Sequence, residues 1–466
     1  MKKNIRLKTS GSVNFPEKDA NDVLFSKILR KILPIIFIAY FFSFLDRVNI
    51  GYAKLQMLPE LGLTEIQYGL AAGIFFLGYA FFEIPSNILL AKTGARKTLT
   101  RIMLLWGVTS AATMFVTSAN QLYLLRLMLG IFEAGFFPGI ILYLSFWFPS
   151  YMRGRVTALL MLATLVAPII GGPVSGLIMD GMHDYAGLSG WRWLFLLEAL
   201  PIIVVGVFCF FYLCDSPAQA AWLSQEEKEQ HSKIMVRDNT VSENDSAHTS
   251  YLRSALMDPR VYVLAFLYFS SALGVYTFNF WLPTSIQKLG ISSVTSISLF
   301  TIIPFIFAGM GMILIGRSSD LKRERRWHFV CSILFGALML SLSTIWSHSL
   351  PVTIICLSGA SFGFSGAVIV CWAIPSTYLK GKAAPAGIAL VSSLGVLSGF
   401  AGPALIGVTR DLTGSDSIGF YIISCIMVLS AVAMLRLMPA HALAVGDSGR
   451  PEDVKGEKND LHSSKT

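Results

Sequence analysis

Apolar residues along this chain gather into twelve long runs separated by short polar connections. A helix that crosses a bilayer needs about 20 mostly apolar residues, so the pattern predicts twelve membrane-spanning helices and an all-α integral membrane protein. We place them at residues 32–53, 68–91, 99–118, 122–148, 156–179, 193–214, 258–283, 294–316, 328–347, 351–373, 383–408 and 418–439.

A polar gap at residues 215–257 separates six runs from six. The string from Gln225 to Gln230 predicts a short amphipathic helix, and the Ser/Asn/Asp-rich stretch at 242–250 predicts a flexible linker. The expected organisation has five parts: an N-terminal tail (1–31), a first six-helix half (32–214), a central loop (215–257), a second half (258–439) and a C-terminal tail (440–466).

The composition agrees with this pattern. Hydrophobic residues make up 54% of the 466 residues, charged residues only 14%, and the mean hydropathy is +0.62. About a quarter of a typical soluble chain is charged, so a soluble enzyme, a disordered chain and a nucleic-acid binder are excluded. The six cysteines lie in apolar runs without a Cys-x-x-Cys pair, and the seven histidines lie in loops, tails or at a span's edge. Neither a disulfide framework nor a metal site is expected.

Lys and Arg are distributed very unevenly between alternate connections. If both termini are cytoplasmic, the cytoplasmic segments hold 31 of the 37 basic residues and the outer loops hold 4, among them Lys54 and Arg192. Arg47 and Arg126 lie inside spans. By the positive-inside rule, this asymmetry predicts an even number of spans with both ends in the cytoplasm. The first run is a retained helix rather than a signal peptide, because no small-residue cleavage site follows it.

The two halves repeat each other. The Trp-x-Pro-Ser-Tyr string that begins at Trp147 recurs in looser form from Trp372, and Gly172-Pro173 recurs as Gly402-Pro403, with offsets between 225 and 230. Two duplicated halves with a site between them near the bilayer midplane form the architecture of an alternating-access carrier.

The basic loops between spans resemble the signature of the major facilitator superfamily. In the second half, Gly316, Asp320, Arg325 and Arg326 fit Gly-x3-Asp-x4-Arg-Arg. The first half departs from this pattern: Asn87 and Ala91 stand at the Gly and Asp positions, and what remains is Lys92, Gly94, Arg96 and Lys97. The resemblance implies a gating role for Gly94 and Arg96 in the first loop and for Gly316, Asp320 and Arg325 in the second, but the first loop lacks the Asp that a gating ion pair would use.

Within that superfamily, the strings at residues 44–51, 126–139 and 190–198 resemble the anion:cation symporter family, in particular bacterial organic-acid permeases for hydroxyphenylacetate and tartrate. The resemblance covers about residues 30–440. It implies a monomeric, multi-pass transporter of the bacterial cytoplasmic membrane. It also implies that the partners are a small organic anion, the proton and the lipid bilayer, with no nucleic acid, no metal and no cofactor beyond the coupling proton.

A few charged residues lie inside the spans. Placing a charged side chain near the centre of the bilayer costs about 2.5–3.5 kcal/mol on insertion scales. Arg126 and Glu133 are seven residues apart, so they share one helical face about 10 Å apart along the axis. Asp46 and Arg47 point about 100° apart, with Asn49 on the Asp46 face. The resemblance implies that these two helices pack together, and that Asp46 and Glu133 couple protons.

The two arginines are candidates for binding the carboxylate of a substrate, because a guanidinium can bind a carboxylate with two hydrogen bonds. The alternative is that the four charges form a structural ion-pair network. Further candidates for lining the substrate site are Tyr79, Asn279, Trp372 and Ser392, each of which is also explained by helix packing. The family often has Asn near Ser392 and Val396, and its absence here favours an aromatic or less hydroxylated acid.

Two further acids in the spans have simpler explanations. Glu83, beside Pro85, is expected to make hydrogen bonds at a helix end. Glu198 is expected to be an interfacial anchor together with Trp191 and Arg192 near the outer membrane surface.

We therefore expect a secondary transporter that imports a small organic anion, such as an aromatic or hydroxy carboxylate, together with protons. The alternatives are a proton-coupled antiporter that exports drugs or anions, and a transporter-like sensor. An enzyme is not expected, because the sequence contains no Gly-x-Ser-x-Gly or His-Glu-x-x-His string, and it has no phosphate-binding loop for ATP.

Overall fold

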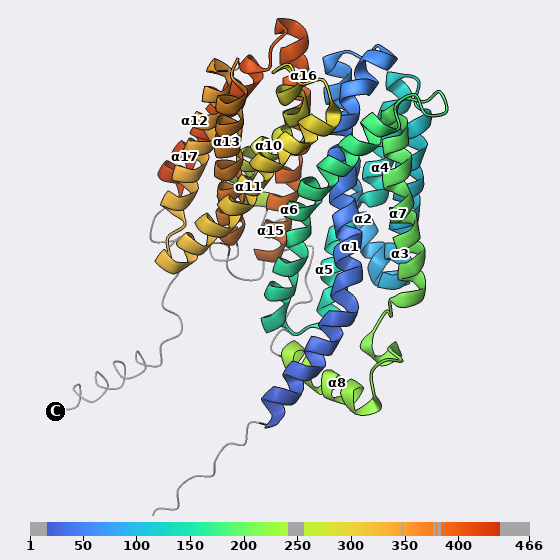
Figure 1. Cartoon of the computed structure of the whole chain (residues 1–466). Helices are drawn as coiled ribbons and strands as arrows, with labels where there is room; N and C mark the ends of the chain where they lie inside the picture. Colours follow the sequence, from blue (N-terminus) through green and yellow to red (C-terminus); the bar gives the residue numbers. More distant parts are fainter. Residues whose placement is uncertain (1–15, 241–255, 347, 376–378, 380–383, 439–466) are drawn as a thin grey trace, which may run out of the picture. The chain divides into compact units, whose positions relative to one another are not determined.

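Each of the twelve apolar runs contains a helix in the computed structural model of the chain (Figure 1). The structure describes residues 16–240, 256–346, 348–375, 379 and 384–438. Residues 1–15 of the expected N-terminal tail, the whole predicted linker, the C-terminal tail and the basic pair Lys380 and Lys382 lie outside the described residues.

The first six runs form seven helices. They are α1 (Pro16–Leu61), α2 (Glu65–Thr93), α3 (Ala95–Ala112), α4 (Ala119–Glu133), α5 (Phe136–Trp147), α6 (Ser150–Gly181) and α7 (Gly190–Tyr212). The predicted amphipathic helix of the central loop is α8 (Gln225–Thr240). The second six runs contain α10 (Pro259–Gln287), α11 (Val294–Lys322), α12 (Arg326–Ile345), α13 (Leu350–Ala373), α15 (Ala384–Val396), α16 (Ser398–Thr413) and α17 (Ser417–Leu437).

Within the described residues, eleven helical segments are long and apolar enough to cross a membrane, counting the broken fourth and eleventh runs once each. The segment that does not qualify is α3, because Arg96, Lys97 and Arg101 lie in its first two turns. Its C-terminal part is nevertheless buried against the other helices, including the fully buried Trp106.

The fourth run is broken, although the sequence predicts one continuous helix. The break falls at Ala134–Gly135, where Gly135 adopts a left-handed conformation with φ of 81°. A Cβ atom at Gly135 would lie 2.6 Å from the side chain of Ser86. Glycine is favoured at this position for two reasons: it adopts a positive φ easily, and it has no Cβ atom to prevent the close approach to α2.

Helix α1 is longer at both ends than its predicted span. At its C-terminal end it continues past Lys54, which the sequence analysis placed in an outer loop. Lys54 is only 3% exposed, and its ammonium group lies 2.8 Å from the Glu65 carboxylate. The buried ion pair compensates the cost of enclosing this cation, so the helix does not need to end before it.

The chain divides into two compact units. The first comprises the described residues of Met1–Ser246 and Phe280–Ile302, and the second those of Ala247–Asn279 and Ile303–Thr466. The end of α10 and the start of α11 therefore belong to the first unit. The predicted boundaries of the two six-helix halves stay predictions.

Small residues bring helices close together within each unit. In the first unit, α2 packs against α4, and a Cβ atom on Gly130 would lie 2.0 Å from the Phe75 carbonyl oxygen. In the second, α12 packs against α13 and α17, and a Cβ on Gly363 would lie 2.5 Å from the Gly336 nitrogen. This use of glycine for close backbone approach is typical of membrane helices.

Helix α8 is docked at the N-terminal end of α1 (Figure 1). Lys27 of α1 donates hydrogen bonds of 2.7 and 2.8 Å to the Glu227 carboxylate. His231 is 4% exposed and contacts the Trp147 carbonyl oxygen at 3.0 Å. The support from α8 explains why α1 begins well before the span that the sequence predicts.

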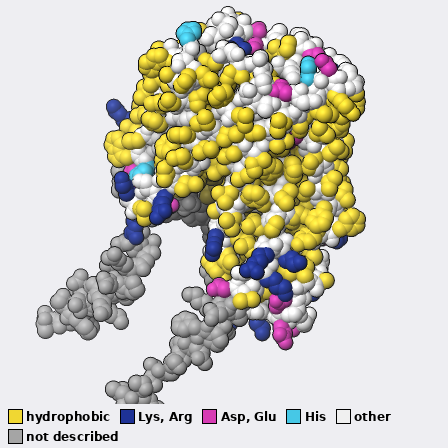
Figure 2. Space-filling view, viewed as in Figure 1, with side chains coloured by type: hydrophobic (Ala, Val, Ile, Leu, Met, Phe, Trp, Pro, Cys, Tyr) yellow, Lys and Arg dark blue, Asp and Glu magenta, His cyan; other side chains and the backbone are white. Residues whose placement is uncertain are grey.

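Hydrophobic side chains cover the flanks of the helices on the face shown in Figure 2, and Lys and Arg gather near the lower ends of the helices. The exposed large apolar residues of α2 and α7 include Phe81, Ile84, Val204 and Phe211. A lipid-facing surface accounts for apolar residues on the outside of helices, since hydrocarbon chains solvate them as well as a protein core does.

Candidate functional site

The predicted charge cluster lies inside the first unit and is centred on an ion pair between α1 and α4. The Arg47 guanidinium contacts Glu133 through Nη2 at 2.6 Å and donates from Nε to Glu133 Oε1 at 2.8 Å. Ser43, one turn earlier on α1, donates to the same oxygen at 2.6 Å. Glu133 is fully buried, so this carboxylate is held by a cation and a hydroxyl rather than by water.

Asp46 points from α1 toward α3. Its Oδ2 accepts a 2.9 Å hydrogen bond from the indole nitrogen of Trp106, and Oδ1 accepts from the Ser110 hydroxyl and from Asn49 Nδ2 at 3.2 Å. The expected divergence of Asp46 and Arg47 is confirmed, because the two side chains contact different helices. The helix packing differs from the expectation: α1 packs chiefly against α6 and α7, and it reaches α4 through side chains.

Arg126 makes no ion pair within 4 Å with Asp46 or Glu133 among the described residues. It is 1% exposed, and its guanidinium carbon lies 5.2 Å from the centre of the Phe75 ring. Its charge still acts on both Asp46 and Glu133 over a longer distance. Within the described part of the chain, Arg126 Nε and Nη2 and Glu133 Oε2 are buried without a hydrogen-bond partner.

Aromatic residues of α2 line the arginines. The Arg47 guanidinium carbon lies 5.0 Å from the Tyr79 ring centre and 5.5 Å from that of Phe75. Both arginines thus contact Phe75, and each such contact contributes about 0.5–2 kcal/mol. The structure brings five predicted residues together: Asp46, Arg47, Tyr79, Arg126 and Glu133.

Four participants were missed by the sequence analysis: Ser43, Phe75, Trp106 and Ser110. The hydroxyls of Ser43 and Ser110 and the indole of Trp106 are polar groups within apolar runs, which is the signal that could have identified them. Phe75 has no such signal, because phenylalanine is common in membrane helices.

The other predicted lining residues belong to the second unit. Asn279 of α10 is 6% exposed. Trp372 of α13 is 39% exposed and packs edge-on against Tyr268, with ring centres 4.8 Å apart. Ser392 lies on α15 and is partly exposed. Their roles stay predictions.

The interfacial role expected for Glu198 is wrong. Glu198 is 3% exposed and accepts hydrogen bonds from Ser175 and Asn49. Trp191 and Arg192 instead bind Glu60 of α1, at 2.5 and 3.1 Å. Residues six apart on an α-helix point about 120° away from each other, so Arg192 and Glu198 face different surroundings.

Glu83 of α2 is partly exposed, and the charge of Arg47 acts on it. Its backbone carbonyl oxygen accepts a 2.9 Å hydrogen bond from Asn87 Nδ2. The hydrogen bonding expected of its own carboxylate at the helix end stays a prediction.

The first basic loop uses an acid from elsewhere in the chain. Gly94 has φ of 88° and precedes α3, and the Arg96 backbone N–H donates to Asp215 Oδ1 at 2.8 Å. A Cβ on Gly94 would lie 2.8 Å from that same oxygen. Asp215, which follows α7, thus provides a carboxylate where the loop itself has Ala91 in place of Asp.

The second basic loop retains its own acid. Arg325 contacts Asp320 at 2.6 Å and donates to the Ser319 hydroxyl at 3.2 Å. Gly316 has room for a Cβ atom, with Ile369 at 3.6 Å. The motif residues Asp320 and Arg325 therefore pair as neighbours, while the gating function of both loops stays a prediction.

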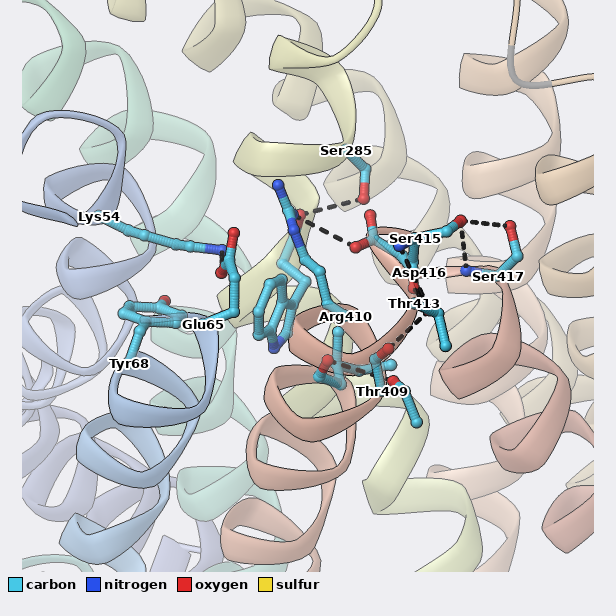
Figure 3. Close-up of polar contacts among 12 residues, drawn as sticks. Lys54, Glu65, Tyr68, Ser285, Thr409, Arg410, Thr413, Ser415, Asp416 and Ser417 are labelled. Carbon is cyan, nitrogen blue, oxygen red and sulfur yellow. Dashed lines mark hydrogen bonds and ion pairs between the residues drawn. The ribbon is translucent and has the colours of Figure 1, made fainter. Parts of the chain in front are cut away.

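A second buried cation lies at the opposite end of α1 from α8. Figure 3 shows Lys54, Glu65 and Tyr68 together. The Lys54 ammonium lies 3.5 Å from the Trp281 ring centre and 4.7 Å from that of Tyr68. Tyr68 also donates to the Phe280 carbonyl oxygen at 3.1 Å. These contacts hold the start of the Phe280–Ile302 segment within the first unit.

Comparison with known proteins decides the family. The sequence profile named Major Facilitator Superfamily matches residues 36–403 and 264–461. The chain belongs to the major facilitator superfamily. It is a transporter and not an enzyme, and its helical, membrane-spanning architecture is the one expected from the sequence.

Relatives support the resemblance to organic-acid permeases. A protein of Pseudomonas putida, provisionally named metabolite transport protein NicT, is 42% identical over 414 residues, covering 89% of this chain and 94% of its own. A provisionally named tartrate transporter of Agrobacterium vitis is 42% identical over 421 residues, covering 90% of this chain and 96% of its own.

A solved structure supports the fold. The D-xylose–proton symporter matches with a TM-score of 0.70 at 15% identity, covering 88% of this chain and 98% of its own. At this identity, the likeness concerns the helical architecture alone.

Proposed function

We propose that this transporter imports a small organic carboxylate together with protons across the bacterial inner membrane. The proposal places both termini in the cytoplasm and treats the protein as a monomer. The excess of Lys and Arg in the connections assigned to the cytoplasm supports this orientation.

The observation that carries the proposal is the state of Arg126. An arginine is charged at every physiological pH, and a buried guanidinium normally has its N–H groups hydrogen-bonded. Arg126 is 1% exposed, yet its Nε and Nη2 have no partner among the described residues. A substrate carboxylate would accept hydrogen bonds from Nε and Nη2, and its negative charge would balance the positive charge of Arg126.

The Arg47–Glu133 pair supports proton coupling. A carboxyl group in a low-dielectric surrounding favours its neutral form, whereas a nearby arginine favours the anion. A substrate carboxylate near Arg126 and Arg47 would compete with Glu133 for the positive charge. Glu133 would then take up a proton. In the same way, the long-range attraction between Arg126 and Asp46 would weaken when a substrate anion binds Arg126.

The surroundings of the arginines favour a planar or aromatic acid. The Phe75 ring lies beside both guanidinium groups and the Tyr79 ring beside that of Arg47, and a planar substrate could stack on these rings. The names of relatives, a tartrate transporter and a metabolite transporter, are compatible with an organic acid. Asn279, Trp372 and Ser392 are also proposed to bind the substrate.

Export of drugs is a second candidate function. A protein of Acinetobacter baumannii named quinolone resistance transporter is 37% identical over 402 residues, covering 86% of this chain and 92% of its own. Quinolones also carry a carboxylate and an aromatic ring, so the same arginines and Phe75 could bind them. Export would exchange the drug for protons rather than carry both in one direction.

Ligand-induced thermal stabilisation of the purified protein tests the substrate class. The panel contains 4-hydroxyphenylacetate, benzoate, L-tartrate and norfloxacin, with the amide 4-hydroxyphenylacetamide as the uncharged control. We expect at least one acid to raise the melting temperature, the amide to leave it unchanged, and Arg126→Lys to remove the effect. Arg155→Lys, an exposed arginine, is the matched control. Equal stabilisation by acid and amide would contradict carboxylate recognition.

A further inference from the structure

Glu198 of α7 is a buried carboxyl group that the proposed exchange at Arg126 does not use. Its Oε1 accepts a 2.6 Å hydrogen bond from Ser175 of α6, and its Oε2 accepts a 3.1 Å bond from Asn49 of α1. No Lys, Arg or His among the described residues forms an ion pair with it. This distinguishes Glu198 from Glu133, which has Arg47 in contact.

Asn49 joins Glu198 to Asp46. The same nitrogen, Asn49 Nδ2, donates to Asp46 Oδ1 at 3.2 Å and to Glu198 Oε2 at 3.1 Å. An amide NH2 group has two hydrogens, so it can satisfy both carboxyl groups at once. Because the two oxygens share one nitrogen, a charge on either carboxyl group acts strongly on the other.

The other groups around this pair do not compensate a second negative charge. The titratable neighbours of Glu198 are Asp46 and Tyr52, both on α1. Helix α6 contributes the hydroxyl of Ser175, and α3 contributes Trp106 and Ser110, whose hydrogen bonds go to Asp46. The one cation that acts on the pair is Arg126, and it acts on Asp46. Two like charges in a buried site without a second cation are costly.

We propose that Glu198 is a third proton-carrying carboxyl group of the transporter, coupled to Asp46 through the shared Asn49 amide. The inference rests on the proposed proton symport for its role in transport. Glu198 keeps its proton while Asp46 is ionised, and it is free to release that proton once Asp46 has taken one up. Each proton comes from water and returns to water, so only O–H bonds form and break.

Infrared spectroscopy of the full-length protein tests this without any substrate. Protonated carboxyl groups have a C=O stretching band that disappears on ionisation, and the band is followed from pH 6 to pH 10, where ordinary exposed carboxyl groups are ionised. We expect Glu198→Gln to remove one band and the exposed control Glu226→Gln to remove none. Glu198→Asp restores a carboxyl band if the fold is intact. In Asp46→Asn, the Glu198 band should disappear at a different pH from wild type, because a neighbouring charge is gone.

A spectrum of Glu198→Gln that matches wild type at every pH would overturn the inference. An unchanged Glu198 titration in Asp46→Asn would overturn the coupling. Circular dichroism and the melting temperature identify any variant that fails to fold, and Glu198→Asp then decides the assignment through the shift of its band.

The transport role is tested in proteoliposomes with radiolabelled 4-hydroxyphenylacetate or L-tartrate and an internal pH dye. We expect Glu198→Gln to carry fewer protons per acid than wild type, and Glu226→Gln to carry the same number. Slower uptake with an unchanged ratio would mean a purely structural role and would overturn the inference. If wild type moves neither acid, the proposed substrate class fails, while the infrared result decides on Glu198 separately.

Discussion

Arg47 and Glu133 form a buried ion pair across 86 positions of sequence, with Arg47 Nη2 2.6 Å from Glu133 Oε1. Glu133 is fully buried and the Arg47 side chain is 14% exposed. Breaking such a pair from one side costs about 3–5 kcal/mol, because the remaining charge loses its partner. A substrate anion that competes for Arg47 can recover this cost only if Glu133 takes up a proton.

Removing the charge of either acid should separate transport from coupling. We expect Asp46→Asn and Glu133→Gln to abolish accumulation of the acid against its gradient while exchange of labelled for unlabelled acid survives. The reason is that a neutral amide can accept hydrogen bonds but cannot carry a proton through the cycle. Counterflow and uphill uptake in proteoliposomes measure the two activities. Asp184→Asn, an exposed acid, is the control, and uphill uptake at the wild-type level in Asp46→Asn would exclude its coupling role.

Replacing an arginine by lysine should weaken substrate binding. One ammonium group cannot reproduce two parallel hydrogen bonds from a planar guanidinium, and a hydrogen bond to a charged group contributes about 1.5–3 kcal/mol. We therefore expect Arg126→Lys to raise Kd about 10- to 100-fold. Isothermal titration with the acid that stabilises wild type measures the change. Wild-type affinity in Arg126→Lys would reject the contact.

The close contact between α2 and α4 should not tolerate a methyl group. A Cβ atom on Gly130 would lie 2.0 Å from the Phe75 carbonyl oxygen, and the helices would have to separate. Overpacking of this kind costs about 1–3 kcal/mol, and it would also displace the Phe75 ring from both arginines. We expect Gly130→Ala to lower the melting temperature and the affinity together. Gly181→Ala has open space around it and should change neither.

Docking of α8 should weaken in acid. Hydrogen bonds from Ser150 and the charge of Arg153 lower the pKa of Asp238, and Lys27 lowers the pKa of Glu227. Burial lowers the pKa of His231. An acid with a lowered pKa stabilises the folded state above its ordinary pKa, near 4, and this stabilisation is lost as pH falls. A histidine with a lowered pKa opposes docking below about pH 6.5.

Hydrogen exchange of residues 225–240, corrected for the intrinsic rate at each pH, measures this docking. We expect protection to decline from pH 7.5 to 5.5 and to decline further at pH 4. Asp238→Asn should show weaker protection already at neutral pH, whereas the exposed control Glu226→Gln should match wild type. Protection independent of pH would contradict this account of the α8 contacts.

The sequence predicted the helices well because a bilayer requires long apolar runs. It could not predict the break at Gly135, since glycine is common within membrane helices and its positive φ depends on the neighbouring Ser86. The sequence analysis also misplaced Lys54, because a lysine at the edge of an apolar run is normally assigned to the adjoining loop. The ion pair with Glu65 that encloses it is a tertiary contact.

The charged residues of the site were predicted because apolar runs make them easy to recognise. Charged residues in apolar runs are visible in sequence, so Asp46, Arg47, Arg126 and Glu133 could be identified. Which surroundings each one meets depends on how the helices are rotated. Glu198 follows Trp191 and Arg192 closely in sequence, but it lies about two turns from Trp191 along α7, where it meets Asn49 and Ser175.

The central claim is that an organic acid and protons cross in the same direction. The most direct test is a pH recording in weakly buffered medium outside proteoliposomes that contain the wild-type protein, after addition of the acid that stabilises it. The account predicts that the outside becomes more alkaline as the acid enters, and that Glu133→Gln and an uncoupler both abolish the change. Acid entry without any pH change, or with acidification of the outside, would contradict proton symport.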